Sequence, residues 1–84
     1  MTLKDIQPGK IVKITHILGG RGIHFHLSRL GIYKGDKVKV LESAPFGGPI
    51  LVEHLQSGAR IAIGLGMASK IIVEEIDAQQ TKTV

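Results

Sequence analysis

The sequence predicts a small, mainly β protein in which five short strands bend into a single barrel. The chain has 84 residues, which is enough for one domain with one core. Its composition is 43% hydrophobic with two Phe, one Tyr and no Trp, so the interior must be aliphatic. It has no cysteine, and 11 glycines divide the apolar segments into lengths that suit strands. Packing and strand pairing therefore have to stabilise the fold.

The first strand is predicted at residues 10–18. This run is rich in β-branched residues and lies between the turn signals Pro8-Gly9 and Gly19-Gly20. Val12 and Ile14 are two residues apart, so they should share one face of the strand.

A short helix is predicted next, within residues 21–31. Ile23, Leu27 and Leu30 fall at i, i+4 and i+7 and form one apolar stripe. Gly31 suits the left-handed residue that closes a helix. We therefore expect a helix of about two turns between the first and second strands.

The second strand is predicted at residues 37–42, after a turn at residues 33–36. Gly35 occupies the turn position at which type II geometry requires a positive φ. Val38 and Val40 alternate with charged residues, so they should point inward.

A hairpin and a last strand complete the predicted elements. Strands at residues 49–55 and 60–63 form the hairpin, because the connection between them is short and contains Gly58 for a positive φ. Residues 64–70 allow one further helical turn, although two glycines weaken it. The last strand is predicted at residues 71–76.

These elements favour one small barrel of the SH3-like or OB-like type. Five short strands between glycine turns form a strongly bent sheet, and closing that sheet removes exposed edges. No internal repeat or interior linker divides the sequence. We expect a single domain at residues 1–76 and a flexible polar tail at residues 77–84.

The charge of the chain bears on partners and location. The net charge is +4 and the pI is near 9.7, which admits nucleic acid, an anionic lipid surface or an acidic protein as partner. Alternatively, the lysines are only the solvated faces of strands, namely Lys10, Lys13, Lys37 and Lys39. The longest apolar run, residues 61–68, is too short for a membrane span, and the first residues lack the apolar region of a signal peptide. We expect a cytosolic protein that reaches the inner face of the membrane only through a partner.

Four motifs occur in order between residues 3 and 73. They are Leu3-x-x-Ile6-x-Pro8-Gly9, Leu30-Gly31-Ile32-x-x-Gly35-Asp36-x-Val38, Ala44-Pro45-x-Gly47-Gly48-Pro49-Ile50 and Ala68-x-x-Ile71-x-Val73. Together they resemble the ferrous iron transport protein A (FeoA) family of small SH3-like barrels. Two positions depart from the family pattern: Lys34 stands where proline is frequent, and His54 stands at a strand position that is usually apolar.

The resemblance implies a small cytosolic accessory protein of bacterial or archaeal ferrous iron uptake. Its partner would be the cytosolic part of the FeoB permease, which it would modulate. The same module also looks like the SH3-like domain at the end of some metal-dependent repressors, so the fold alone does not establish the role. The alternative function is therefore a small basic barrel that binds nucleic acid, or a regulatory module of a metal-dependent repressor system.

The sequence indicates no enzyme. No Ser-His-acid arrangement and no nucleophile elbow is recognisable. The segment Gly19-Gly20-Arg21-Gly22 resembles a phosphate loop but lacks its Gly-Lys-Ser/Thr ending. A tight turn into the predicted helix explains these glycines.

The histidines are weak candidates for a metal site. His24 and His26 are two residues apart, which places them on different sides of a helix. We therefore expect no required cofactor, and only weak surface binding of Fe²⁺ or Zn²⁺ through His24, His26 or His54.

The predicted partner surface lies on the helix. Phe25 falls off the apolar stripe and Phe46 lies at the tip of a connection, so each is either an exposed anchor for a partner or a cap on one end of the barrel. The predicted partner-binding residues are Arg21, His24, Phe25, Arg29 and Phe46. Scattered aromatic residues make a poor platform for nucleic acid, so we expect no nucleic-acid partner. Open strand edges allow weak self-association, which nothing in the sequence specifies.

Overall fold

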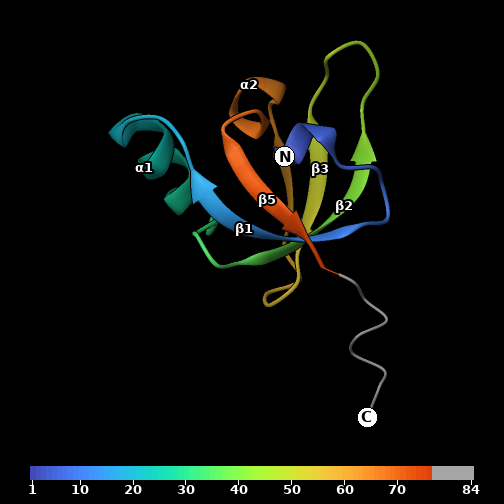
Figure 1. Cartoon of the computed structure of the whole chain (residues 1–84), viewed down its shortest axis with the longest axis horizontal. Coiled ribbons are helices and arrows are strands. Elements are labelled where there is room, and N and C mark those ends of the chain that lie inside the picture. The colour runs from blue at the N-terminus through green and yellow to red at the C-terminus, as the bar shows by residue number, and fades with distance from the viewer. Residues whose placement is uncertain (77–84) are drawn as a thin grey trace.

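The fold is one antiparallel sheet of five strands with short helical segments around it (Figure 1). The computed structural model describes residues 1–76, so the predicted tail at residues 77–84 lies outside the described residues. The strand order is β4-β3-β2-β1-β5. The strands are β1 (Ile11–Ile17), β2 (Lys37–Ser43), β3 (Ile50–His54), β4 (Arg60–Ile63) and β5 (Ile71–Glu75). The helical segments are the 3₁₀ helix η1 (Leu3–Asp5), α1 (Arg21–Arg29) and α2 (Leu65–Ala68).

The mainly β class and all five predicted strands are confirmed. Both helical predictions are also confirmed, with α1 between β1 and β2 and α2 immediately before β5. The sheet bends strongly, but among residues 1–76 no ladder joins β4 to β5, so the barrel is open along that seam. The sequence reasoning missed η1, because three residues are too few to show a helical period.

The core is a single cluster of aliphatic side chains. Val12, Val38 and Val40 are buried in it, as their alternation with polar residues predicts. The helix α1 contributes Leu27, and Ile23 and Leu30 pack against the cluster from the same stripe. The buried set is Leu3, Ile6, Val12, Ile14, Leu27, Ile32, Val38, Val40, Ile50, Val52, Ile63, Ala68, Ile71 and Val73.

The first residues of the chain cover the outer edge of β5. Thr2 forms a bridge with Ile72, and the Val73 N–H donates to the Met1 carbonyl at 3.0 Å. The Asp5 carboxylate accepts hydrogen bonds from the N–H and the hydroxyl of Thr2, both at 3.0 Å. These bonds favour the ionised carboxylate and lower the pKa of Asp5 below its ordinary value of 3.8. The η1 turn therefore holds the segment that protects this edge.

Removing the Asp5 carboxylate should destabilise the protein in a pH-dependent way. Because the pKa of Asp5 is lower in the folded state, its stabilising contribution is complete above 3.8 and is lost as pH falls through the folded value. We expect Asp5→Asn to lower the melting temperature at neutral pH, and this difference to shrink as the pH falls below 3.8, measured by circular dichroism. Glu42→Gln is the control, because it removes an exposed carboxylate at the end of β2. A deficit that persists unchanged in acid would contradict the assignment.

Candidate functional site

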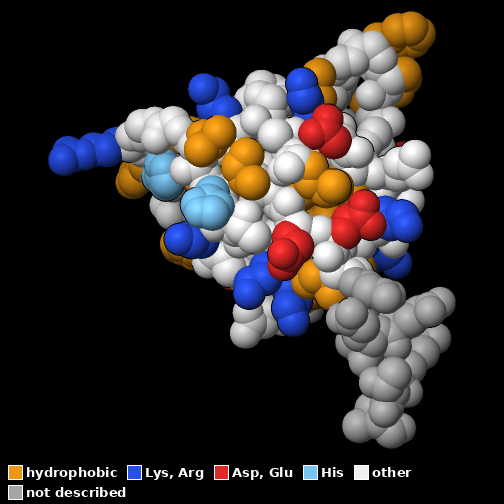
Figure 2. Space-filling model, in the orientation of Figure 1, with side chains coloured by type: hydrophobic (Ala, Val, Ile, Leu, Met, Phe, Trp, Pro, Cys, Tyr) orange, Lys and Arg blue, Asp and Glu red, His pale blue; other side chains and the backbone are white. Residues whose placement is uncertain are grey.

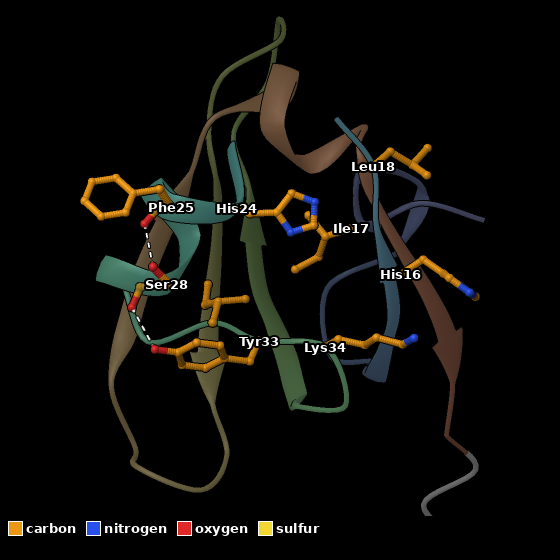
Figure 3. A pocket seen from close by; sticks show the side chains of 9 residues that line it. His16, Ile17, Leu18, His24, Phe25, Ser28, Tyr33 and Lys34 are labelled. Carbon is orange, nitrogen blue, oxygen red and sulfur yellow. Dashed lines mark hydrogen bonds between the residues drawn. The ribbon is translucent and has the colours of Figure 1, made fainter. Parts of the chain in front are cut away.

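A groove of about 640 Å³ lies between the end of β1, the helix α1 and the loop that leads to β2 (Figure 3). Its volume falls within the range of about 300–1,000 Å³ that is usual for ligand clefts. Apolar side chains provide most of the lining, and several polar tips project among them. The lining residues are His16, Ile17, Leu18, His24, Phe25, Ser28, Ile32, Tyr33 and Lys34.

A β-bulge in β1 positions His16 and Ile17, which form one wall of this groove. The pairing of β1 with β5 shifts by one residue between Ile14 and His16, so Thr15 is the extra residue. Unbroken alternation from Ile14 would point His16 inward. After the bulge, His16 is exposed at the groove and Ile17 packs against the core. The Thr15 hydroxyl anchors the bulge by donating to the Ile72 carbonyl at 3.2 Å.

The C-terminal end of α1 positions the base of the groove, which we call its floor. The Gly31 N–H donates to the Ser28 carbonyl at 3.0 Å, and the Ile32 N–H donates to the Leu27 carbonyl at 2.9 Å. This pair of bonds is a Schellman motif, and it requires the left-handed conformation that Gly31 adopts at φ 82°. The predicted role of Gly31 is therefore confirmed. Leu27 and Ile32 are both buried, so the groove floor is continuous with the core.

Exposed apolar side chains gather on this groove. Phe25 is 65% exposed, Tyr33 is 55% exposed and Leu18 is 50% exposed. They are three of the six large hydrophobic residues that are exposed among residues 1–76. The Arg29 guanidinium lies 5.8 Å from the centre of the Phe25 ring, within range of a cation–π interaction. Apolar exposure concentrated on one hollow is typical of a binding surface.

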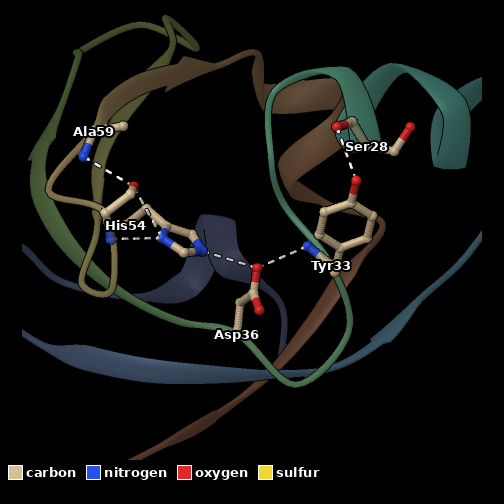
Figure 4. Close-up of polar contacts among 6 residues, drawn as sticks. Ser28, Tyr33, Asp36, His54 and Ala59 are labelled. Carbon is tan, nitrogen blue, oxygen red and sulfur yellow. Dashed lines mark hydrogen bonds and ion pairs between the residues drawn. The ribbon is translucent and has the colours of Figure 1, made fainter.

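A chain of hydrogen bonds holds Tyr33, which forms one wall of the groove (Figure 4). The Asp36 Oδ2 accepts from the Tyr33 N–H at 3.0 Å and contacts the His54 Nε2 at 2.9 Å. The Tyr33 hydroxyl donates to the Ser28 carbonyl at 3.3 Å, which ties the loop to α1. The other ring nitrogen of His54, Nδ1, accepts from the Ser57 N–H at 3.3 Å. Because a backbone N–H can only donate, Nδ1 must hold a lone pair, and Nε2 carries the proton that is donated to Asp36.

These contacts show that His54 has a structural role, whereas the sequence suggested it as a weak metal ligand. It is only 8% exposed, and both of its ring nitrogens are engaged within the protein. A polar side chain at this inward strand position is accommodated because Asp36 and Ser57 satisfy it. Within residues 1–76, no three His, Asp or Glu side chains group closely enough to hold a metal ion. Weak metal binding through the exposed His24 or His26 stays a prediction.

The structure gathers some of the predicted partner residues and leaves others apart. His24 and Phe25 line the groove, and Arg29 adjoins it through the Phe25 ring. Arg21 is exposed at the first residue of α1. Phe46 belongs to the loop between β2 and β3, and Figure 1 shows this loop on the opposite side of the molecule from α1.

The loop at Phe46 is unusual in its backbone. Phe46 has φ 58° and Gly47 has φ 78°, and the Gly48 N–H donates to the Pro45 carbonyl at 3.3 Å. Positive φ at both central residues is the pattern of a type I′ turn, where a bulky residue such as Phe is strained. The Phe46 side chain is fully exposed, so the idea that it caps the barrel is wrong.

Sequence reasoning missed several groove residues, among them His16, Leu18, Tyr33 and Lys34. They come from segments that the sequence separates and only the fold brings together. One signal was present, because the alternation of β1 fails at Thr15-His16-Ile17, where a polar pair interrupts the apolar positions.

Comparisons with known proteins agree with each other. A sequence profile described as the FeoA domain matches residues 1–75. A protein of Methanocaldococcus jannaschii named "Putative Fe(2+) transport protein A" is 36% identical over 71 residues, which cover 84% of this chain and 82% of that protein. A crystal structure described as an iron uptake regulatory protein (FeoA) has a TM-score of 0.82 at 34% identity, and the match covers 90% of this chain and 97% of that chain.

The same fold also occurs as part of larger proteins. A manganese-dependent transcriptional repressor in complex with manganese has a TM-score of 0.84 at 23% identity. The match covers 90% of this chain but only 36% of the repressor chain. At this identity the likeness concerns the fold alone.

Replacing His54 should cost stability. We expect His54→Ala to lower the free energy of unfolding by about 2 kcal/mol, because Asp36 loses its imidazole donor and a small cavity opens. Urea unfolding followed by circular dichroism measures this change. His26→Ala is the matched control on the exposed face of α1, where we expect a change within about 0.5 kcal/mol. Equal responses of the two variants would show that the buried bonds contribute nothing.

Relieving the strain at Phe46 should stabilise the protein. Asn tolerates a positive φ better than Phe does, so Phe46→Asn should raise the free energy of unfolding by about 1 kcal/mol. Thermal unfolding reports the change. Phe46→Ala removes the same ring without this tolerance and should give no comparable gain. If Asn and Ala behave alike, the backbone strain is not the cause.

Proposed function

The chain belongs to the FeoA family, and on that basis we propose that it is an accessory protein that docks through its groove on the cytosolic part of a FeoB-type permease. The family has a role in ferrous iron transport and is not a known family of enzymes. We place the protein in the cytoplasm, recruited to the inner face of the membrane by the permease. None of the helices in residues 1–76 has the length and apolar character needed to cross a bilayer.

One observation carries this proposal: three exposed apolar side chains and a stacked arginine surround a single groove. Protein interfaces are enriched in aromatic residues and arginine at their centre, with polar groups at the rim. Phe25 and Tyr33 provide aromatic area, and Arg29 is held over the Phe25 ring. The groove therefore has the composition of a protein-binding surface.

The shape of the groove is also held by core packing and hydrogen bonds. Its floor residue Ile32 belongs to the core, and its wall residue Tyr33 is bonded to both Asp36 and α1. A partner that docks here meets a surface whose shape is already formed, so little entropy is lost on ordering it. We propose that docking of this preformed surface shifts either the gating or the nucleotide cycle of the permease.

The alternative of nucleic-acid binding has weaker support. The outer face of the sheet mixes charges, because Lys13 lies opposite Glu74 on β5 as well as Lys37 on β2, and Lys39 lies opposite Glu53 on β3. The face in Figure 2 accordingly carries acidic and basic side chains interspersed. A mixed face lacks the continuous positive potential that binding to a phosphate backbone requires. The repressor-like fold supports a regulatory module only by analogy.

Capture of the permease tests this proposal. We expect Phe25→Asp to weaken capture of the full-length permease from solubilised membranes by about 30-fold or more, because a charge replaces an aromatic anchor. Leu55→Asp is the matched control, since it places the same charge on another exposed apolar residue outside the groove. Circular dichroism verifies that both variants fold. Capture that survives Phe25→Asp undiminished would contradict docking through this groove.

A further inference from the structure

The groove is basic as well as apolar. Its polar lining residues are His16, His24, Ser28, Tyr33 and Lys34, and no Asp or Glu side chain is among them. The whole of α1 likewise contains no acidic residue. Lys34 therefore gives the lining a net positive formal charge.

Asp36 is the acidic residue that lies closest in sequence to the lining residues. It follows Lys34 by two residues, and its carboxylate is hydrogen-bonded to His54 and to the Tyr33 N–H (Figure 4), so it is not part of the groove lining. Within residues 1–76, no Lys or Arg side chain forms an ion pair with an acidic side chain. Lys34 and Arg29 consequently present their positive charges to solvent at the groove.

From these observations we propose that the groove binds a short acidic amphipathic segment of its protein partner. The apolar side chains of the segment pack against Ile17, Ile32 and Phe25, and its carboxylates lie beside Lys34 and Arg29. This inference rests on the proposed docking function and specifies the chemistry of the partner at that site.

The two kinds of contact have different consequences. Burial of apolar area on a preformed floor supplies most of the affinity. Charge complementarity at the rim speeds encounter and excludes segments that are basic at the same positions. The rim charges are exposed, so their effect should fall as salt rises.

A pair of synthetic peptides tests the charge preference. Both carry the same apolar residues at helical spacing, and the flanking positions hold Glu in one peptide and Lys in the other. We expect the Glu peptide to shift the amide NMR resonances of groove residues in the 84-residue chain and to saturate. The Lys peptide should bind at least about tenfold more weakly. Higher salt should reduce this difference.

Charge reversal at the rim provides the matched variants. Lys34→Glu should remove the preference for the Glu peptide, because it inverts the charge at the groove. Lys10→Glu makes the same change in net charge on an exposed residue beyond the other end of β1 and should leave the preference intact. Equal binding of both peptides, shifts outside the groove, or no binding by either would overturn the acidic preference.

The same variants separate this inference from the proposed function. If the permease is captured equally by the native chain and by Lys34→Glu at low and high salt, docking stands and the acidic segment is wrong. If the Glu peptide binds the groove as described but the permease is not captured at all, the permease is the wrong partner and the acidic preference stands.

Discussion

Burial of a single aliphatic interior is the constraint on which the rest of this structure depends. The chain has no cysteine to staple it, so the sheet keeps its bend only while inward residues such as Val12 and Val40 share one core with Leu27 of α1. The helix is fastened to the sheet by the same packing. Because Ile32 is both core and groove floor, the shape of the groove is a consequence of the fold and not of a flexible loop.

The strands and helices were predictable where apolar residues recur at regular spacing or where a glycine marks the end of an element. Strand alternation predicted the inward valines, and Gly31 predicted the end of α1, because both depend on neighbours in the chain. The site was predictable only in part. His24 and Phe25 were found from the helix, but the pairing of His54 with Asp36 joins residues 18 apart, and no local rule reveals it. The bulge at Thr15 was also missed, since a period-two reading assumes an unbroken ladder.

The fold itself does not separate an accessory protein of transport from a repressor domain. Both an FeoA protein and a manganese-dependent repressor superimpose on this chain with TM-scores of 0.82 and 0.84. The role must therefore be argued from the chemistry that this chain carries on the barrel, which is an apolar groove, two basic residues beside it and a hydrogen-bonded tyrosine. A small scaffold can take up different roles in this way without altering its interior.

The bulge in β1 has a consequence for how the length of this strand can change. Two residue phases coexist in one strand, with Val12 and Ile14 in the first and Ile17 in the second. Closing the bulge while Thr15 is retained would drive an imidazole into the hydrocarbon interior and expel an isoleucine to water, whereas deleting Thr15 would merge the phases and leave both side chains on their present faces. A one-residue deletion therefore keeps the inward and outward faces of β1 only at the bulge, and elsewhere in the strand it would turn core residues such as Val12 toward water.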